Sequence, residues 1–142
     1  MSKSLMFVRK VDLEKEPQLK QWIEDGKDKN AFDPKVLGYP CTETYAVHTN
    51  GTTHAVMPIQ PVVMLESIGI NPEASPSQAA SAMMELLKAV ALLAQRAGSR
   101  ELYFLASDDG TSDGAERLGF VKVPASVYRM RLYSGEENAG KP

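Results

Sequence analysis

Three groups of side chains in this sequence could take part in chemistry. Glu66 stands in a run of apolar residues, where a carboxylate could act as a general base. Ser75-Pro76-Ser77-Gln78 opens a helical pattern, and the N-terminus of a helix attracts anions through its free N–H groups and its dipole. His48 and His54 flank a turn and belong to a residue type that binds metal ions. The sequence therefore offers a base, an anion site and a metal pair as candidates.

The two histidines are poorly placed to share one metal ion. Asn50-Gly51 predicts a two-residue hairpin turn, because both residues tolerate positive φ. In that register Val47 faces His54 and His48 faces Thr53. The histidine side chains then point to opposite sides of the hairpin. We expect no metal site here.

Composition limits the class of protein. The chain has 142 residues, of which 43% are hydrophobic and 24% charged, so we expect one domain over residues 1–133 and a disordered polar tail over residues 134–142. The formal net charge of −2 makes nucleic acid an unexpected partner. One cysteine, Cys41, excludes an internal disulfide and has no evident histidine partner. Apolar runs are too short for a signal peptide or a membrane span, which favours a cytoplasmic protein.

The first half of the chain predicts strands around one helix. Leu5–Val11 is rich in β-formers, and a helix follows from Pro17 to the stop signal Gly26. Lys27–Pro40 is interpreted as a loop or a short irregular helix. Thr42–Met57 is the hairpin.

The second half predicts a strand, a long helix and a second strand. Val62–Ile70 reads as a buried strand with a bulge at Gly69. The helix begins near Pro76, with capping-box spacing between Ser75 and Gln78, and ends before Gly98. Its expected buried stripe consists of Met83, Leu86, Leu87, Val90, Leu93 and Ala97. The remaining expected elements are a strand over Leu102–Ala106, a helix capped by Thr111 or Ser112 and stopping at Gly119, and a strand pair over Phe120–Val123 and Val127–Tyr133.

This β-α-β order, followed by a helix ending in Leu118-Gly119-Phe120, resembles the second half of the GNAT acyl-CoA N-acyltransferases. The resemblance implies an α/β (α+β) fold with a mixed, mostly antiparallel, splayed sheet flanked by helices. It also implies acetyl-CoA as co-substrate. Val62–Ile70 and Leu102–Ala106 should then be neighbouring parallel strands.

The resemblance also implies where acetyl-CoA would bind. The pantetheine arm would pair with the first of these strands near Ile68 and Ile70, and the pyrophosphate would lie at the start of the long helix. Two alignments of the family's phosphate loop remain open, one starting at Gln78 and one at Ser75, and neither supplies its glycines. The expected pyrophosphate contacts are Gln78, Ala79, Ala80, Ser81 and Ala82. An alternative interpretation makes Gln78 the capping-box partner of Ser75.

For catalysis the resemblance implies a base and an acid. Glu66 would be the base, the alternative being a carboxylate that simply faces solvent. The tyrosine that serves the family as acid is replaced by Ala115. Tyr128 or Tyr103 could substitute, although ordinary packing within its strand is the favoured interpretation of each.

Two functional hypotheses follow from the resemblance. The first is an acyl-CoA-dependent N-acyltransferase that transfers an acetyl group to a small-molecule or peptide amine. The second is a catalytically inactive GNAT-fold protein that serves as a binding or structural subunit. The sequence is compatible with a homodimer or with a subunit of a larger assembly, and it indicates no nucleic-acid or membrane partner.

Overall fold

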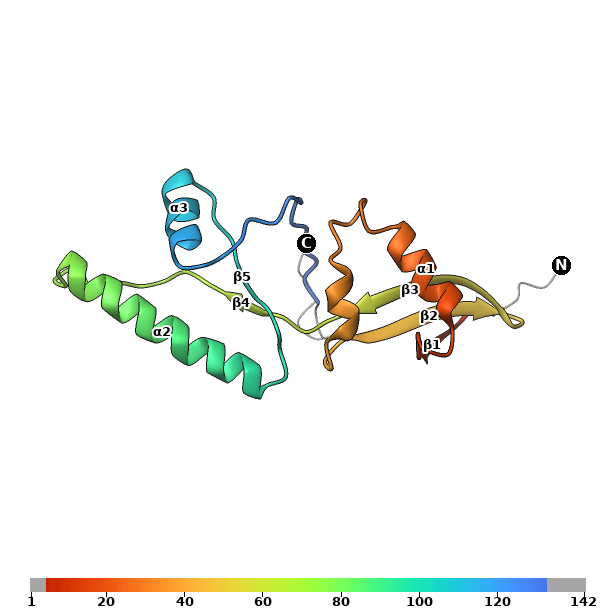
Figure 1. Ribbon diagram of the computed structural model, residues 1–142. Helices are drawn as coiled ribbons and strands as arrows, with labels where there is room; N and C mark the ends of the chain where they lie inside the picture. Colours follow the sequence, from red (N-terminus) through yellow and green to blue (C-terminus); the bar gives the residue numbers. More distant parts are fainter. Residues whose placement is uncertain (1–4, 133–142) are drawn as a thin grey trace, which may run out of the picture.

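The protein consists of two groups of elements arranged along an elongated molecule (Figure 1). The computed structural model describes residues 5–132. The first group holds a three-stranded antiparallel sheet and one α-helix, and the second holds a two-stranded parallel sheet and two α-helices. The mixed α/β class expected from the sequence is therefore confirmed, with the strands divided between two sheets.

The antiparallel sheet has the order β1-β2-β3, with β1 at Phe7–Val11, β2 at Glu43–Thr49 and β3 at Thr52–Ile59. Asn50 and Gly51 adopt φ values of 48° and 83°, so the predicted hairpin turn is confirmed. The register differs at one point. Val47 pairs with Ala55 rather than with His54, because a bulge interrupts the ladder there.

Helix α1, Pro17–Asp25, covers this sheet and carries the buried core (Figure 1). Leu19 is fully buried and packs with Val11 of β1 and Ala46 of β2. Arg9 donates two hydrogen bonds to the Glu16 carboxylate, at 2.7 and 3.0 Å, which fixes the entry to α1. The following 27–40 region contains one short 3-10 helix, η1, Pro34–Gly38, as the sequence indicated.

The second group is a parallel crossover. Strand β4, Val63–Leu65, pairs in parallel with β5, Leu102–Phe104, and helix α2, Pro76–Arg96, joins them. The predicted parallel neighbours are confirmed, but β4 is far shorter than the expected strand over Val62–Ile70. The pairing with β5 ends at Leu65, and residues 66–70 are not part of a strand. Gly69 is therefore not a bulge within a strand.

The break between the two sheets has a local cause. Strand β3 ends at Ile59, and β4 begins only at Val63. Pro61, between the two strands, has no N–H group to donate to a neighbouring strand. Consequently β3 and β4 lie in different sheets.

Both ends of α2 are as predicted. At its start, the Gln78 N–H donates to Ser75 Oγ at 3.1 Å, and the Ser75 N–H donates to Gln78 Oε1 at 2.9 Å. At its end, Gly98 has a φ of 89° and the N–H of Ser99 donates to the Ala94 carbonyl, which is a Schellman motif. The capping box and the glycine stop are both confirmed.

The buried stripe of α2 was predicted only in part. Met83, Leu87 and Val90 are half-buried and Ala94 is buried. Leu86 and Leu93 are instead exposed, and so is Ala97 at the end of the predicted stripe. The α2 surface that carries these two leucines therefore has no partner among the described residues of the chain.

The tripeptide Leu118-Gly119-Phe120 follows helix α3, Asp109–Arg117. It ends the helix and contacts strand β5. Gly119 has a φ of 99°, and the N–H of Phe120 donates to the Ala115 carbonyl, which is a second Schellman motif. The Phe120 ring then packs against Phe104 of β5, with centroids 6.2 Å apart. The helix stop at Gly119 is confirmed. The N-cap is Asp108, which accepts from the Thr111 N–H at 2.7 Å, rather than Thr111 or Ser112.

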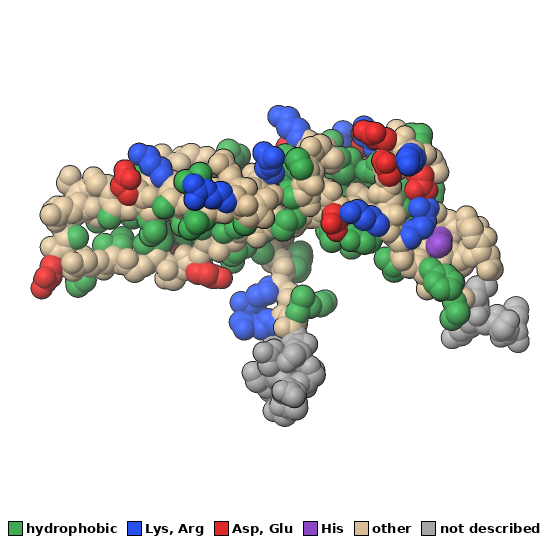
Figure 2. Space-filling model, turned by 90° about the horizontal axis from the view of Figure 1, so that it is seen from below, with side chains coloured by type: hydrophobic (Ala, Val, Ile, Leu, Met, Phe, Trp, Pro, Cys, Tyr) green, Lys and Arg blue, Asp and Glu red, His purple; other side chains and the backbone are tan. Residues whose placement is uncertain are grey.

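The predicted terminal strand pair is absent from the described residues. Residues 121–132 form no strand, and their apolar side chains are exposed. In Figure 2 the segment that leads into the C-terminal grey residues projects away from the body of the molecule. The alternating sequence favoured strands, but a strand needs a partner and none lies beside this segment. Tyr133 and the predicted disordered tail lie outside the described residues.

Candidate active site

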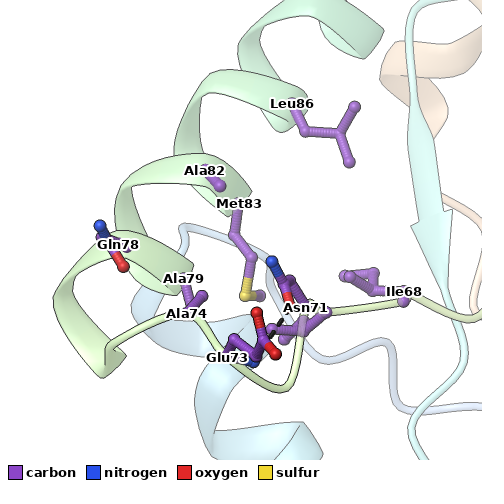
Figure 3. A pocket seen from close by; sticks show the side chains of 11 residues that line it. Ile68, Asn71, Glu73, Ala74, Gln78, Ala79, Ala82, Met83 and Leu86 are labelled. Carbon is purple, nitrogen blue, oxygen red and sulfur yellow. Dashed lines mark hydrogen bonds between the residues drawn. The ribbon is translucent and has the colours of Figure 1, made fainter.

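An open pocket of about 510 Å³ lies between the chain leaving β4 and the first turns of α2 (Figure 3). Met83 and Leu86 extend from α2 toward the loop that carries Ile68 and Asn71. The residues that line it are Ile68, Gly69, Ile70, Asn71, Glu73, Ala74, Gln78, Ala79, Ala82, Met83 and Leu86. The pocket thus has one wall of exposed backbone and one wall of helix.

The backbone wall is available for hydrogen bonding. Residues 66–70 follow β4, are exposed, and make no backbone hydrogen bond among the described residues. Beyond them the chain turns at Asn71, whose side-chain oxygen accepts from the Glu73 N–H at 3.0 Å. An extended ligand with amide groups could pair with this stretch as an added strand does.

The helical wall offers few free donors. Pro76 has no N–H, the Gln78 N–H is donated to Ser75 Oγ, and the Ala79 N–H is donated to the Ser75 carbonyl at 2.9 Å. In the first turn, Ser77 keeps the one N–H without an acceptor among the described residues. The capping box therefore occupies most of the anion-binding capacity of this helix N-terminus.

The charge of the pocket is also unfavourable for a phosphate. Glu73 is the one charged residue among those lining it, and no lysine or arginine lines it. A carboxylate close to a pyrophosphate would repel it. The pocket thus suits a neutral, amide-containing chain better than a polyanion.

The structure brings most of the expected binding residues to this pocket. Ile68, Ile70, Gln78, Ala79 and Ala82 line it. Ala80 and Ser81 do not. They are exposed residues of the same helix, outside the pocket lining.

The expected catalytic residues are not gathered there. Glu66 is exposed at the first position after β4, just before the residues that line the pocket. Tyr128 is 91% exposed on the projecting segment and does not line the pocket. Ala115, at the position expected of the acid, lies in α3 and gives its carbonyl to the helix cap.

A carboxylate that the sequence analysis missed ties the two groups of elements together. Glu101, directly before β5, accepts hydrogen bonds from Tyr39 and Tyr103, both at 2.8 Å, and from Gln60 at 3.3 Å. Burial, together with this bond to Glu101, raises the pKa of Tyr103 to about 12. The same carboxylate raises the pKa of Tyr39. Nothing in the sequence signals the contact, because Tyr39 and Glu101 are 62 residues apart.

Tyr103 is therefore a poor acid near neutral pH, since its proton is held more tightly than that of an ordinary phenol.

Both histidines make contacts within the antiparallel sheet. His54 contacts Thr49 Oγ1, and the His48 ring packs edge-on against Phe7. Within residues 5–132 no group of three or more candidate ligands could hold a metal ion. No helix in that range is long and apolar enough to cross a bilayer.

Comparisons with known proteins give weak structural likenesses. No family model and no curated protein matches this chain. Among solved structures it is similar to the aminoglycoside N-acetyltransferase AAC(6')-Iy in complex with CoA, with 19% identity, 89% of this chain and 100% of that chain covered, and a TM-score of 0.40. It is also similar to AAC(6')-Ih from Acinetobacter baumannii, with 17% identity, 92% and 100% coverage, and a TM-score of 0.40. A soil metagenomic aminoglycoside acetyltransferase in complex with sisomicin follows, at 13% identity, 91% and 97% coverage, and a TM-score of 0.38. Likenesses this weak do not decide the function.

Proposed function

We propose that this protein is an acyl-CoA-dependent N-acyltransferase that transfers an acetyl group to an amine. The observation that carries the proposal is the backbone of residues 66–70. It leaves a parallel strand pair and has no ladder partner among the described residues, and its last three residues, 68–70, line a pocket against the helix that follows. A pantetheine arm contains two amide groups, which match such a stretch of free N–H and C=O groups.

The fit differs along the ligand. Ile68, Met83 and Leu86 give the arm an apolar wall, and residues 66–70 give it hydrogen-bonding groups. At the diphosphate end, the Ser77 N–H and the dipole of α2 are favourable and Glu73 is unfavourable. We therefore expect binding that is weaker than at a helix N-terminus with all of its donors free.

Acetyl-CoA supplies an activated thioester. Glu66 lies just after β4, where the free backbone begins, and its carboxylate would accept a proton from the attacking ammonium group. The freed amine forms the C–N bond, the C–S bond breaks, and CoA leaves as a thiolate. Because Ala115 cannot donate a proton and Tyr128 lies outside the pocket lining, the thiolate would take its proton from solvent or from the product nitrogen.

The acceptor that we propose is a small-molecule or peptide amine, and the compartment is the cytoplasm. Glu66 is exposed, and the pocket that begins at Ile68 is open to solvent, so an amine would reach Glu66 from solvent. The experiment is a thiol-release assay with acetyl-CoA and a panel of primary amines. We expect amine-dependent release of free CoA, and release that does not depend on any amine would contradict the proposal.

A second candidate is a non-catalytic subunit with the same architecture. The closed capping box at Ser75 and Gln78, together with the carboxylate of Glu73, favours it. Such a subunit would release no CoA with any amine. It would also show no rise of its unfolding midpoint on addition of CoA, because only a ligand that binds the folded state raises it.

A further inference from the structure

We propose that the two groups of elements form a hinged pair that a side-chain latch holds closed. The hinge is the connection between β3 and β4, residues 60–62. The latch consists of the hydrogen bonds that Glu101 accepts from Tyr39 and Gln60. This inference does not depend on the proposed acyl transfer. It rests on how little else joins the two groups, on the geometry of the latch, and on a pocket with a wall in each group.

Little besides the hinge and the latch joins the two groups. Among the described residues, the helices and strands that pack closely on one another belong to the same group. No strand of one sheet pairs with a strand of the other. The chain passes from β3 to β4 through residues 60–62, which belong to no helix or strand (Figure 1). A short connection of this kind lets two packed bodies turn relative to one another.

The latch is a carboxylate that receives hydrogen bonds across the hinge. Glu101 stands directly before β5 in the second group, and its carbonyl accepts from the Val63 N–H of β4 at 3.3 Å. Its carboxylate accepts from the Tyr39 hydroxyl of the first group at 2.8 Å and from the Gln60 amide at 3.3 Å. Glu101 thus holds β4 through its backbone and the first group through its side chain.

The closed junction also contains an unfavourable feature, which indicates a latch that can open. Gln60 Oε1 is buried and has no hydrogen-bond partner among the described residues, and the same is true of Thr42 Oγ1. The register of β2 and β3 ends with Glu43 opposite Ile59, and one further pair would set Thr42 opposite Gln60. A buried polar atom without a partner destabilises the state that buries it, because water would satisfy that atom. Opening the junction would let water reach both atoms.

Opening would change a second open pocket, of about 520 Å³, that has walls in both groups. One wall is the 27–34 region of the first group. The other is Pro124, which closely follows the Phe120 ring that packs on Phe104 of β5. All residues that line the pocket beside α2 belong to the second group, so that pocket would keep its shape. The latch thus controls the width of the cleft between the groups and leaves the candidate active site intact.

The first test measures the distance between the groups by double electron–electron resonance. Spin labels are placed at Lys20 on α1 and Ala89 on α2, two exposed positions, in a chain whose Cys41 is replaced by serine. With the latch intact we expect one narrow distance distribution. Tyr39→Phe removes the hydroxyl that crosses the hinge and should raise the open fraction by roughly fivefold or more. A broad distribution with the latch intact, or an unchanged one in Tyr39→Phe, would overturn the proposal.

Tyr45→Phe is the matched control. The Tyr45 hydroxyl donates to the Glu43 carboxylate at 2.6 Å, so this variant loses the same type of hydrogen bond, but both residues lie in β2. We expect it to keep the narrow distribution, and an equal broadening would show that the effect does not come from the junction. Glu101→Ala removes the acceptor of the latch and should open the pair at least as much as Tyr39→Phe. A Glu101→Ala chain that stays closed would refute the proposal even if Tyr39→Phe failed to fold.

Discussion

At the scale of single residues, two carboxylates have different roles. Glu101 is engaged by Tyr39, Gln60 and Tyr103, and it holds the two groups of elements together. Glu66 has no such partners among the described residues and stands exposed at the start of the free backbone. A carboxylate that is already hydrogen-bonded by three side chains is structural, whereas an unengaged one beside a pocket is the better candidate for proton transfer.

The first prediction concerns the alkaline limit of stability. The pKa of Tyr103 is raised from 10.0 to about 12 in the folded state. A raised pKa means that the folded state holds the phenolic proton more tightly than the unfolded state does. The resulting stabilisation is complete below pH 10 and is lost as the pH rises through about 12. Tyrosinate absorbance should show a phase that titrates late, to which Tyr39 and Tyr103 both contribute, and Tyr103→Phe should remove its latest part. A spectrum in which every tyrosine titrates near 10 would contradict the Glu101 cluster.

The second prediction concerns the base. Glu66→Gln keeps the shape of the side chain and removes the carboxylate, so CoA release with an amine acceptor should fall by roughly 10²-fold or more. Folding stability should change little, because Glu66 is exposed. Glu73→Gln is the matched control, since Glu73 is the carboxylate that lines the pocket itself, and its loss should leave the rate no lower. Equal rates for wild type and Glu66→Gln would remove Glu66 from the mechanism.

At the scale of elements, helix α2 determines which hydrogen-bond donors the pocket can offer to a ligand. Its capping box stabilises the first turn and at the same time uses the donors that a phosphate would need. Its position beside residues 68–74 creates the pocket. The same helix exposes Leu86, which lines the pocket, and Leu93, which does not. One element thus stabilises the fold and forms one wall of the pocket.

The third prediction separates the capping role from the binding role. Ser75→Ala removes the side-chain acceptor of the Gln78 N–H and should lower the free energy of unfolding by about 0.5–2 kcal/mol. Ser77→Ala is the control, because the Ser77 side chain makes no cap and should change stability by less than about 0.5 kcal/mol. Urea denaturation followed by circular dichroism measures both. Identical losses in the two variants would mean that the capping box is not formed in solution.

Local signals in the sequence predicted the element ends well. Asn50-Gly51, the Ser75 to Gln78 spacing and the stops at Gly98 and Gly119 each depend on backbone conformations that neighbouring residues decide. The errors arose where the structure of a segment depends on contacts with residues far away in the sequence. Val62–Ile70 and the segments after Phe120 look like strands, yet a strand forms only beside a partner. Glu101 was missed for the same reason, since its partners come from other parts of the chain.

At the scale of the whole molecule, the buried core and the pocket lie in different groups of elements. The compact core is small and lies in the N-terminal group, where Leu19 packs against the antiparallel sheet. The C-terminal group holds the pocket but leaves β5 with an open edge and α2 with exposed leucines.

The most direct test of the proposed function is a thermal-unfolding titration with acetyl-CoA and CoA on three proteins. Wild type should show a midpoint that rises with ligand concentration, because the ligand binds only the folded state. Ala82→Glu places a carboxylate in the pocket and should abolish the rise. Ser81→Glu adds the same charge one residue away, outside the pocket lining, and should keep the rise. A wild-type midpoint that neither ligand moves, or a loss of the rise in Ser81→Glu but not in Ala82→Glu, would contradict an acyl-CoA site between β4 and α2.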